Sequence, residues 1–244
     1  MEKKKFEEQR LFVQQHVTEQ VQAQFAALIK MPRRDARSPT LSLSGFDVEA
    51  KKDSELPVVE SDWLRQELGF SLTVEASSIE GAGDGVKLNG RLPIGSVIAL
   101  FPGTVYVPEH QKKPQYLREV SNNVYARARF DRVIIDAKNE PHKINHPPAG
   151  SKPNVMPLAF DFPPDEPFTT PEFQRLIPNS FVELPSRLAM FGRRALVHSL
   201  AFISTAEIED GEELFLNYRY NPDNALPDWY TSVDVEADRK MWNP

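Results

Sequence analysis

From Phe70 onward, proline and glycine divide the chain into short apolar runs. The runs are rich in Val, Ile, Phe and Tyr, and each has about the length of a β-strand. They read SLTVEASSI, GSVIALF, GTVYV, NVYARARF, RVIIDA, NVMPLAF, ALVHSLAFIS and EELFLNY. They do not alternate with helical segments as strands of βαβ proteins do. The sequence therefore predicts a β-rich α+β domain with two long, proline-rich connections, at 141–153 and 161–187, and a short helix at PEFQRLI in the second.

The first sixty residues differ from this β-rich part. In residues 2–30, apolar side chains recur at helical spacing, which predicts an amphipathic helix. Such a helix docks either on its own domain or on a partner, and its Gln- and Glu-rich polar face disfavours a membrane surface. Residues 32–60 contain few large apolar groups and several helix breakers, which indicates a linker. SDWLRQELGF then predicts a short helix, capped by Ser61 or Asp62 and ended by Gly69.

The composition limits the chemistry. The chain has 244 residues, a net charge of −6 and no cysteine, which excludes disulfides, cysteine-ligated zinc and a thiol nucleophile. Binding to nucleic acid through bulk charge needs clustered Lys and Arg, so the acidic balance argues against it. No apolar run reaches the roughly 18 residues of a membrane span, and the early acidic residues do not fit a mitochondrial presequence. We therefore expect a cytoplasmic or nuclear protein.

A glycine-rich segment, GAGDGV, occupies residues 81–86. A dinucleotide fingerprint would need glycine in place of Val86 and a helix after it, and neither is present. Hydrolase elbows and phosphate loops are also missing from the sequence. The segment is therefore either a tight turn or a stretch of bare backbone that contacts a ligand.

Several polar residues have the types, but not the settings, of catalytic or metal-binding groups. His142 and His146 have the spacing of two ligands on a helix, but the prolines around them argue against a helix and no third ligand lies near in sequence. No metal site is therefore predicted. His198 lies in an apolar run and is expected to be a hydrogen-bonded core residue. Glu212 and Glu213 are expected to be solvated in a turn.

The last predicted strand leads into Tyr218 and Tyr220. Positions two apart in a strand face the same side of a sheet, so both phenols should point into one space. Taken alone, such a pair is either an ordinary half-buried aromatic contact or part of a binding site.

Four segments, taken in order, resemble the SET domain of protein lysine methyltransferases. They read GAGDGVKLNGRLPIGSVIALFPG, RVIIDA, INHPPAGSKPNV and ALVHSLAFISTAEIEDGEELFLNYRY. That family has a G-x-G-V/I opening, an I-D-A strand, an N-H loop closing on P-N-V, and a G-E-E-L strand ending in tyrosine. The match covers roughly residues 70–221. The stretches LGFSLTVEASSIEGAGDGV and FPGTVY, with the long insertion, are similar to a subfamily called SET domain-containing protein 9.

The resemblance implies a SET fold of several small β-sheets with a C-terminal pseudoknot, in which the last segment passes beneath the N-H loop. It divides the chain into an N-terminal amphipathic helix (1–31), a linker (32–60), a SET domain (61–221) with an insertion near 161–187, and an extension (222–244) that covers the cofactor site.

The resemblance also implies S-adenosylmethionine (AdoMet) as methyl donor and a protein or peptide lysine as substrate. By the family pattern, the donor is held by Asp84, Gly85, Val86, Asn145 and His146. Tyr218 takes the catalytic position where methyl group and amine meet, and Leu216 and Tyr220 line the substrate channel. Trp229 in the extension offers the donor a stacking surface. Neither zinc, nucleic acid nor a membrane is expected as a partner.

The implied chemistry requires a neutral amine. Free lysine has a pKa of about 10.4, so roughly one molecule in a few thousand is neutral at pH 7, and a channel of aromatic rings disfavours the ammonium by desolvation. Ionising Tyr218 at pH 7 would cost roughly 4 kcal/mol, so we interpret it as an orienting hydrogen-bond group rather than a base. Leu216 stands where many SET domains carry Phe or Tyr, and Pro147-Pro148 replace Ser-Cys. These departures favour the alternative, a catalytically inactive module that binds a peptide or protein partner.

Overall fold

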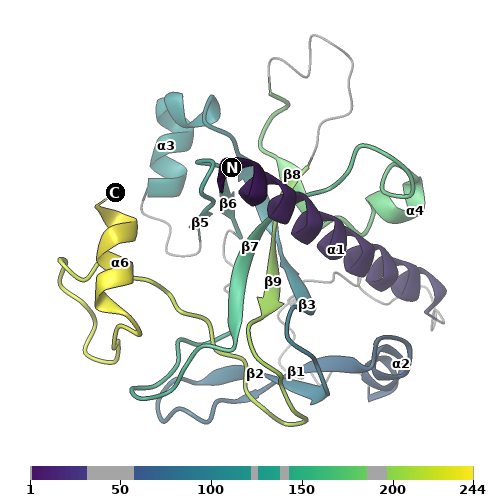
Figure 1. Ribbon diagram of the computed structural model, residues 1–244, viewed down its shortest axis with the longest axis horizontal. Helices are drawn as coiled ribbons and strands as arrows, with labels where there is room; N and C mark the ends of the chain where they lie inside the picture. Colours follow the sequence, from purple (N-terminus) through teal and green to yellow (C-terminus); the bar gives the residue numbers. More distant parts are fainter. Residues whose placement is uncertain (1, 32–57, 122–125, 138–142, 186–196, 244) are drawn as a thin grey trace.

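The structure, a computed structural model, is drawn in Figure 1. It describes residues 2–31, 58–121, 126–137, 143–185 and 197–243. Of the predicted linker (32–60), residues 32–57 lie outside the described residues, as does His142, whereas residues 58–60 belong to a helix. Among the described residues, no helix is long and apolar enough to cross a membrane.

Small elements make up the described chain. The helices are α1 (Glu2–Lys30), α2 (Val58–Leu68), α3 (Pro114–Ser121), α4 (Pro171–Gln174) and α6 (Val235–Trp242), with a 3-10 helix, η1 (His110–Lys112). The strands are β1 (Phe70–Ala76), β2 (Asp84–Gly90), β3 (Val97–Phe101), β4 (Gly103–Tyr106), β5 (Ala126–Ala128), β6 (Ile134–Asp136), β7 (Val155–Asp161), β8 (Asn179–Phe181) and β9 (His198–Ser204).

The strands form three small sheets. Their orders are β1-β2, β3-β9-β7 and β5-β6-β4-β8. All pairs are antiparallel except β4-β8. The predicted β-rich α+β fold of several small sheets with an N-terminal helix is confirmed, and α4 lies where PEFQRLI predicted a short helix.

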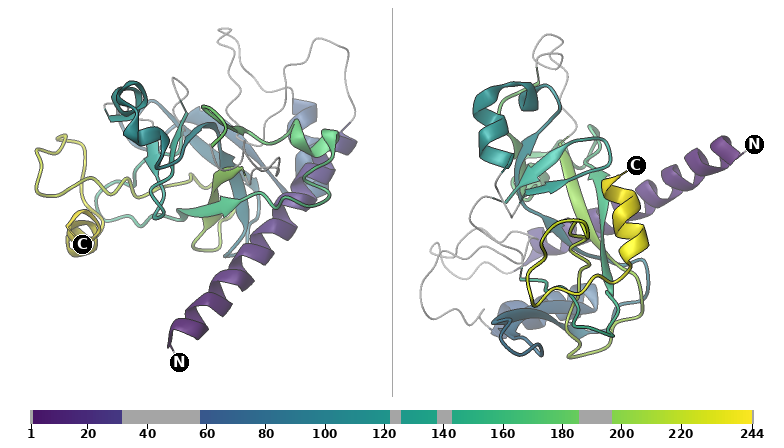
Figure 2. Two further views of the ribbon diagram at one scale, coloured as in Figure 1. Left: turned by 90° about the horizontal axis from the view of Figure 1, so that it is seen from above. Right: turned by 90° about the vertical axis from the view of Figure 1, so that its left-hand side faces the viewer.

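Helix α1 docks through its C-terminal half. Val17, Val21 and Phe25 are at most 2% exposed and form a second core with residues of β3, β7, β9 and the insertion. Burying one such side chain stabilises a fold by about 1.5–3 kcal/mol. The N-terminal turns of α1 extend past the sheets (Figure 2). In this part of the helix the side chains of Leu11 and Phe12 are exposed. Part of the predicted amphipathic face therefore packs on the same chain.

Polar side chains of α1 fix its position along the sheet. Gln20 donates from Nε2 to the Gly95 carbonyl oxygen at 3.0 Å and accepts from the Val97 amide at 2.8 Å. Gln24 donates from Nε2 to the Val97 carbonyl oxygen at 2.6 Å. These glutamines use the free backbone groups at the start of β3, so the helix has one register on the sheet.

Two sequence predictions of local structure need correction. Helix α2 begins at Val58, so Ser61 and Asp62 lie inside it and do not cap it, whereas Gly69 follows its end with a φ of 83° as expected. The run EELFLNY is not a continuous strand. It forms only isolated bridges, because it meets a different neighbour every one or two residues.

The segment 213–218 lies between the two ends of the loop 144–155. Phe215 forms a parallel bridge with Asn145, and Leu216 forms one with Val155. The Leu216 amide donates to the Asn145 carbonyl oxygen at 2.8 Å, and the Val155 amide donates to the Phe215 carbonyl oxygen at 3.1 Å. Residues 213–218, the threaded segment, are thus held on both sides by one earlier loop, which is the pseudoknot that the resemblance implied.

Candidate functional site

Three distant segments meet at the side chain of Asn145. Its Nδ2 donates to the Asp84 carbonyl oxygen at 2.9 Å and to Glu213 Oε1 at 3.2 Å. One amide therefore joins the start of β2, the N-H loop and the threaded segment. Of the residues predicted to bind a donor, Asp84 and Asn145 are brought together directly.

Glu213 is buried and fully engaged, so the prediction of a solvated carboxylate is wrong. It is 6% exposed and accepts from Ser77 Oγ at 2.7 Å, from the Ser78 amide at 2.7 Å and from Ser78 Oγ at 2.6 Å. Burial alone would raise the pKa of Glu213, but the hydrogen bonds from Ser78 and Ser77 outweigh it and lower the pKa. Glu212, in contrast, is exposed as predicted.

Gly85 is required by this carboxylate. A Cβ at Gly85 would lie 2.2 Å from Glu213 Oε1, closer than atoms can pack. Gly81 and Gly83 differ, because both have a positive φ and their Cβ positions would meet open space. The turn at 81–84 is exposed. The interpretation as an exposed turn beside Asn145 is confirmed, and contact of its backbone with a ligand stays a prediction.

The next residue, Val86, is 1% exposed and belongs to the main core. Leu216 is 3% exposed in the same core. Both side chains pack inside the protein, so at these positions the backbone is the part nearest the site. Tyr218 is partly buried and packs against this core.

The Tyr218 hydroxyl donates to the Ile144 carbonyl oxygen at 3.0 Å. Its amide donates to His146 Nδ1 at 3.3 Å. Burial raises the pKa of Tyr218 to about 12, although the nearby Arg127 guanidinium opposes the shift. The phenol is therefore protonated at neutral pH and fixed at both its hydroxyl and its backbone.

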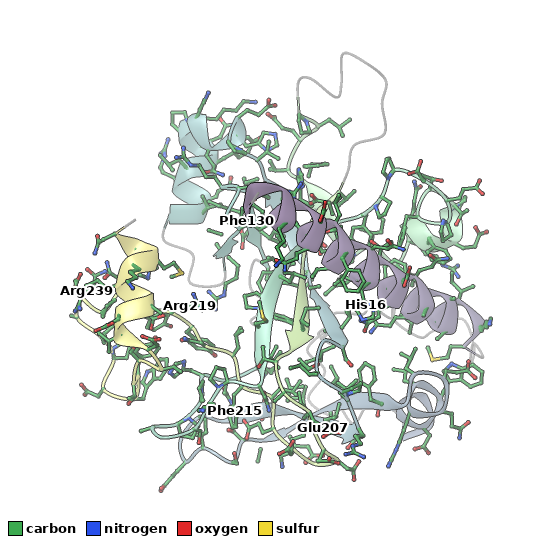
Figure 3. The ribbon with its side chains drawn as sticks, in the orientation of Figure 1. His16, Phe130, Glu207, Phe215, Arg219 and Arg239 are labelled. Carbon is green, nitrogen blue, oxygen red and sulfur yellow. The ribbon has the colours of Figure 1, made fainter. Side chains whose placement is uncertain are left out.

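The rings of Tyr218 and Tyr220 lie 5.9 Å apart, so the predicted proximity of the two phenols is confirmed. The reason is not strand alternation. Arg219 between them has a φ of 51°, in the left-handed region, so the backbone turns there. Arg219 lies beside α6 in Figure 3, and its carbonyl oxygen accepts from Trp242 Nε1 at 2.8 Å.

The C-terminal extension covers this side of the site with aromatic rings. Tyr230 is 6% exposed and stacks on His146 at 4.3 Å and on Tyr220 at 4.7 Å. Trp229 is 61% exposed and meets Tyr218 edge-on at 6.2 Å. Sequence reasoning singled out Trp229, but Tyr230 is the ring buried against the N-H loop. The adjacency of Trp and Tyr in the sequence gave no signal to choose between them.

His146 joins the extension to the threaded segment. The Thr231 carbonyl oxygen can only accept, so His146 Nε2 donates to it at 2.7 Å. The Tyr218 amide can only donate, so Nδ1 is the acceptor. His146 is therefore neutral, and burial lowers its pKa. Protonation would place a hydrogen on Nδ1 against the Tyr218 amide and break this link.

Other candidate groups lie elsewhere. His198 contacts Asp161 through Nδ1 at 2.7 Å, as expected for a hydrogen-bonded residue. Burial would raise the pKa of Asp161, but hydrogen bonds from His198 and Arg129 lower it to about 2. Within the described ranges, no group of three or more His, Asp or Glu side chains could hold a metal ion.

The several small sheets and the threaded segment are consistent with a class of protein, the SET-like fold. No family model matches the chain. It is similar to SET domain-containing protein 9 of Homo sapiens and of Pongo abelii, each 24% identical over 186 residues that cover 64% of this chain. The alignments cover 60% and 66% of those relatives, so the chain spans less than two thirds of their length. These two distant similarities support a SET-domain protein.

Proposed function

We propose that this protein transfers a methyl group from AdoMet to the side-chain amine of a protein lysine. One observation carries the proposal. The threaded segment fixes the Tyr218 hydroxyl on Ile144, next to Asn145, whose amide reaches the exposed glycine turn. Three segments that resemble the donor-binding and catalytic motifs of SET methyltransferases thus converge on one place.

The charges at this place fit the donor. The amino-acid end of AdoMet is a zwitterion, with one carboxylate and one ammonium group. Beside Asn145, Lys143 Nζ donates to Asp84 Oδ2 at 2.8 Å, and both side chains are at least one third exposed. Such a surface pair contributes little to stability and can exchange partners. The proposed donor residues are Asp84, Gly85, Val86, Asn145, His146 and Trp229.

AdoMet supplies an electrophilic methyl group on a sulfonium. The chain supplies position and exclusion of water. The Tyr218 hydroxyl, neutral and held by Ile144, is an orienting group for the incoming amine rather than a base. The rings of Tyr218 and Tyr220 would form the walls of the place where the amine lies, and desolvation there would favour the neutral form of the amine. Ideal positioning of this kind lowers a barrier by up to about 7–11 kcal/mol.

The test uses labelled AdoMet with a peptide or proteome array, and calorimetry for donor binding. Tyr218→Phe keeps the ring but removes the orienting hydroxyl, so turnover should fall by about 10²–10³-fold while the donor still binds. Asn145→Ala should lose the donor itself. Tyr116→Phe, which removes a hydroxyl bonded to Glu183 on the surface, is the matched control and should leave turnover unchanged.

The outcomes separate two function classes. A wild-type protein that binds AdoMet and labels lysine supports the methyltransferase. One that binds AdoMet but labels nothing supports the alternative, a catalytically inactive SET module that binds a peptide or protein partner. A wild-type protein that does not bind AdoMet at all overturns the proposed donor site.

A further inference from the structure

A charged side chain that the sequence motifs do not include lies against the proposed catalytic ring. Arg127 occupies the middle of β5, where it pairs with Ile135 of β6. Its guanidinium carbon lies 5.7 Å from the centroid of the Tyr218 ring. This is within the range of a cation–π interaction.

The surroundings leave this guanidinium as a fixed positive charge. Burial lowers the pKa of Arg127, while Tyr218 and Tyr220 act in the opposite direction. A guanidinium nevertheless stays charged at neutral pH. Its Nη1 also donates to the Ala126 carbonyl oxygen at 3.4 Å.

Other titratable groups lie around this ring: Tyr220 at 5.9 Å and His146 at 5.5 Å between ring centroids, with Asp238 acting on His146 and Tyr230 behind them. His146 is neutral, for the reasons given above, and Tyr230 stacks on it. Asp238 of α6 is fully buried and accepts from Ser232 Oγ at 2.6 Å. Among the described residues, Arg127 is therefore the cationic side chain that contacts the Tyr218 ring.

We propose that Arg127 is a positioning residue that disfavours a second positive charge beside Tyr218 and so keeps the incoming lysine amine neutral. The inference rests on the proposed function, because the amine and the donor methyl group meet at Tyr218. Two unit charges roughly 7–12 Å apart, at an effective dielectric constant of about 20, disfavour each other by a factor of roughly 10–50. The lysine side chain then loses its proton at a lower pH than it would without Arg127.

The decisive measurement needs no turnover. AdoMet carries a positive sulfonium, whereas S-adenosylhomocysteine has the same skeleton without the methyl group and without that charge. Calorimetry gives the ratio of their dissociation constants, which reports the cost of a positive charge at this place. We expect Arg127→Met to bind AdoMet about tenfold better, relative to S-adenosylhomocysteine, than the wild type does.

Three further variants test the interpretation. Arg127→Lys keeps the charge and should keep the wild-type ratio. Arg127→Gln is a second neutral variant, in case the apolar side chain disturbs folding. Arg91→Met removes an exposed arginine that pairs with Glu207 and Glu209 at the far end of β2, and it should leave the ratio unchanged.

A pH profile adds a second readout. Without Arg127 the bound amine keeps its proton to higher pH, so the rise of turnover with pH should move upward by about one unit in Arg127→Met. If both neutral variants keep the wild-type ratio and profile, the role of Arg127 is overturned while the methyltransferase stands. If neither compound binds to the wild type, the proposed function and this inference fall together.

Discussion

The two ends of the segment 213–220 are held by opposite kinds of chemistry. At the first end, an ionised carboxylate, Glu213, is surrounded by the hydroxyl and amide donors of Ser77, Ser78 and Asn145. At the other end, the neutral rings of His146 and Tyr230 stack and exchange hydrogen bonds with backbone groups. The polar end needs a charge to be present, and the aromatic end needs one to be absent.

This difference predicts that the ends release at different pH. The pKa of Glu213 is lowered, so its contribution is present above its ordinary pKa, about 4.3, and is lost as the pH falls through its folded value. The pKa of His146 is also lowered, so its contribution is present above about 6.5 and is lost on acidification from there. The aromatic end should therefore open first.

The largest effect should come from breaking the polar end. Glu213→Ala removes the acceptor of four hydrogen bonds, from Ser77, Ser78 and Asn145, and should lower the free energy of unfolding by about 1.5–3 kcal/mol at pH 7. Glu213→Gln keeps the shape and most acceptors, so its loss should be smaller. Chemical denaturation measures both. The exposed neighbour provides the control, because Glu212→Gln should change stability by less than about 0.5 kcal/mol. A similar loss for Glu212 and Glu213 would contradict the distinction drawn here.

A smaller effect should come from the aromatic end. His146→Ala removes both links and should cost about 1–2 kcal/mol at pH 8. In the wild type, amide exchange over residues 229–242, corrected for its intrinsic pH dependence, should increase between about pH 6.5 and 5 as His146 gains a proton. His146→Gln offers an amide that both donates and accepts but does not titrate. Protection that still changes over this range in His146→Gln would mean that another group controls the extension.

The smallest effect should come from one hydroxyl within the aromatic end. The Tyr230 hydroxyl accepts from the Tyr220 amide at 3.1 Å. Tyr230→Phe keeps the stacked ring and should cost about 0.5–1.5 kcal/mol in chemical denaturation. Tyr230→Leu also removes the stacking and should cost more. Equal losses in the two variants would show that stacking does not hold this end.

Much of the fold follows from local patterns in the sequence. All the apolar runs except EELFLNY contain strands, residues 2–30 form the predicted helix, and Gly69 follows the end of α2. These features depend on neighbours along the chain, which the sequence displays. β2 was missed because its glycines mask a strand that pairs along its whole length with β1.

The site depended on contacts that no local pattern reveals. The partners of Glu213 in Ser77 and Ser78 lie 136 and 135 residues earlier, so its burial could not be predicted from the acidic turn around it. The Tyr218–Tyr220 pair was predicted from strand alternation, but it is made by a turn at Arg219. Resemblance to a family located the segments that converge. It did not say which side chains hold them together.

The threading of residues 213–218 between the arms of the loop 144–155 also constrains synthesis. A nascent chain releases that loop first, and Glu213 follows Asn145 by 68 residues. During this interval the two arms of the loop lack the segment with which both of them form hydrogen bonds. Closing so long a stretch carries an entropic cost before its contacts form. This part of the molecule is therefore completed only in a late folding step, and a translation stop before residue 213 would leave the loop without the segment that joins its two arms.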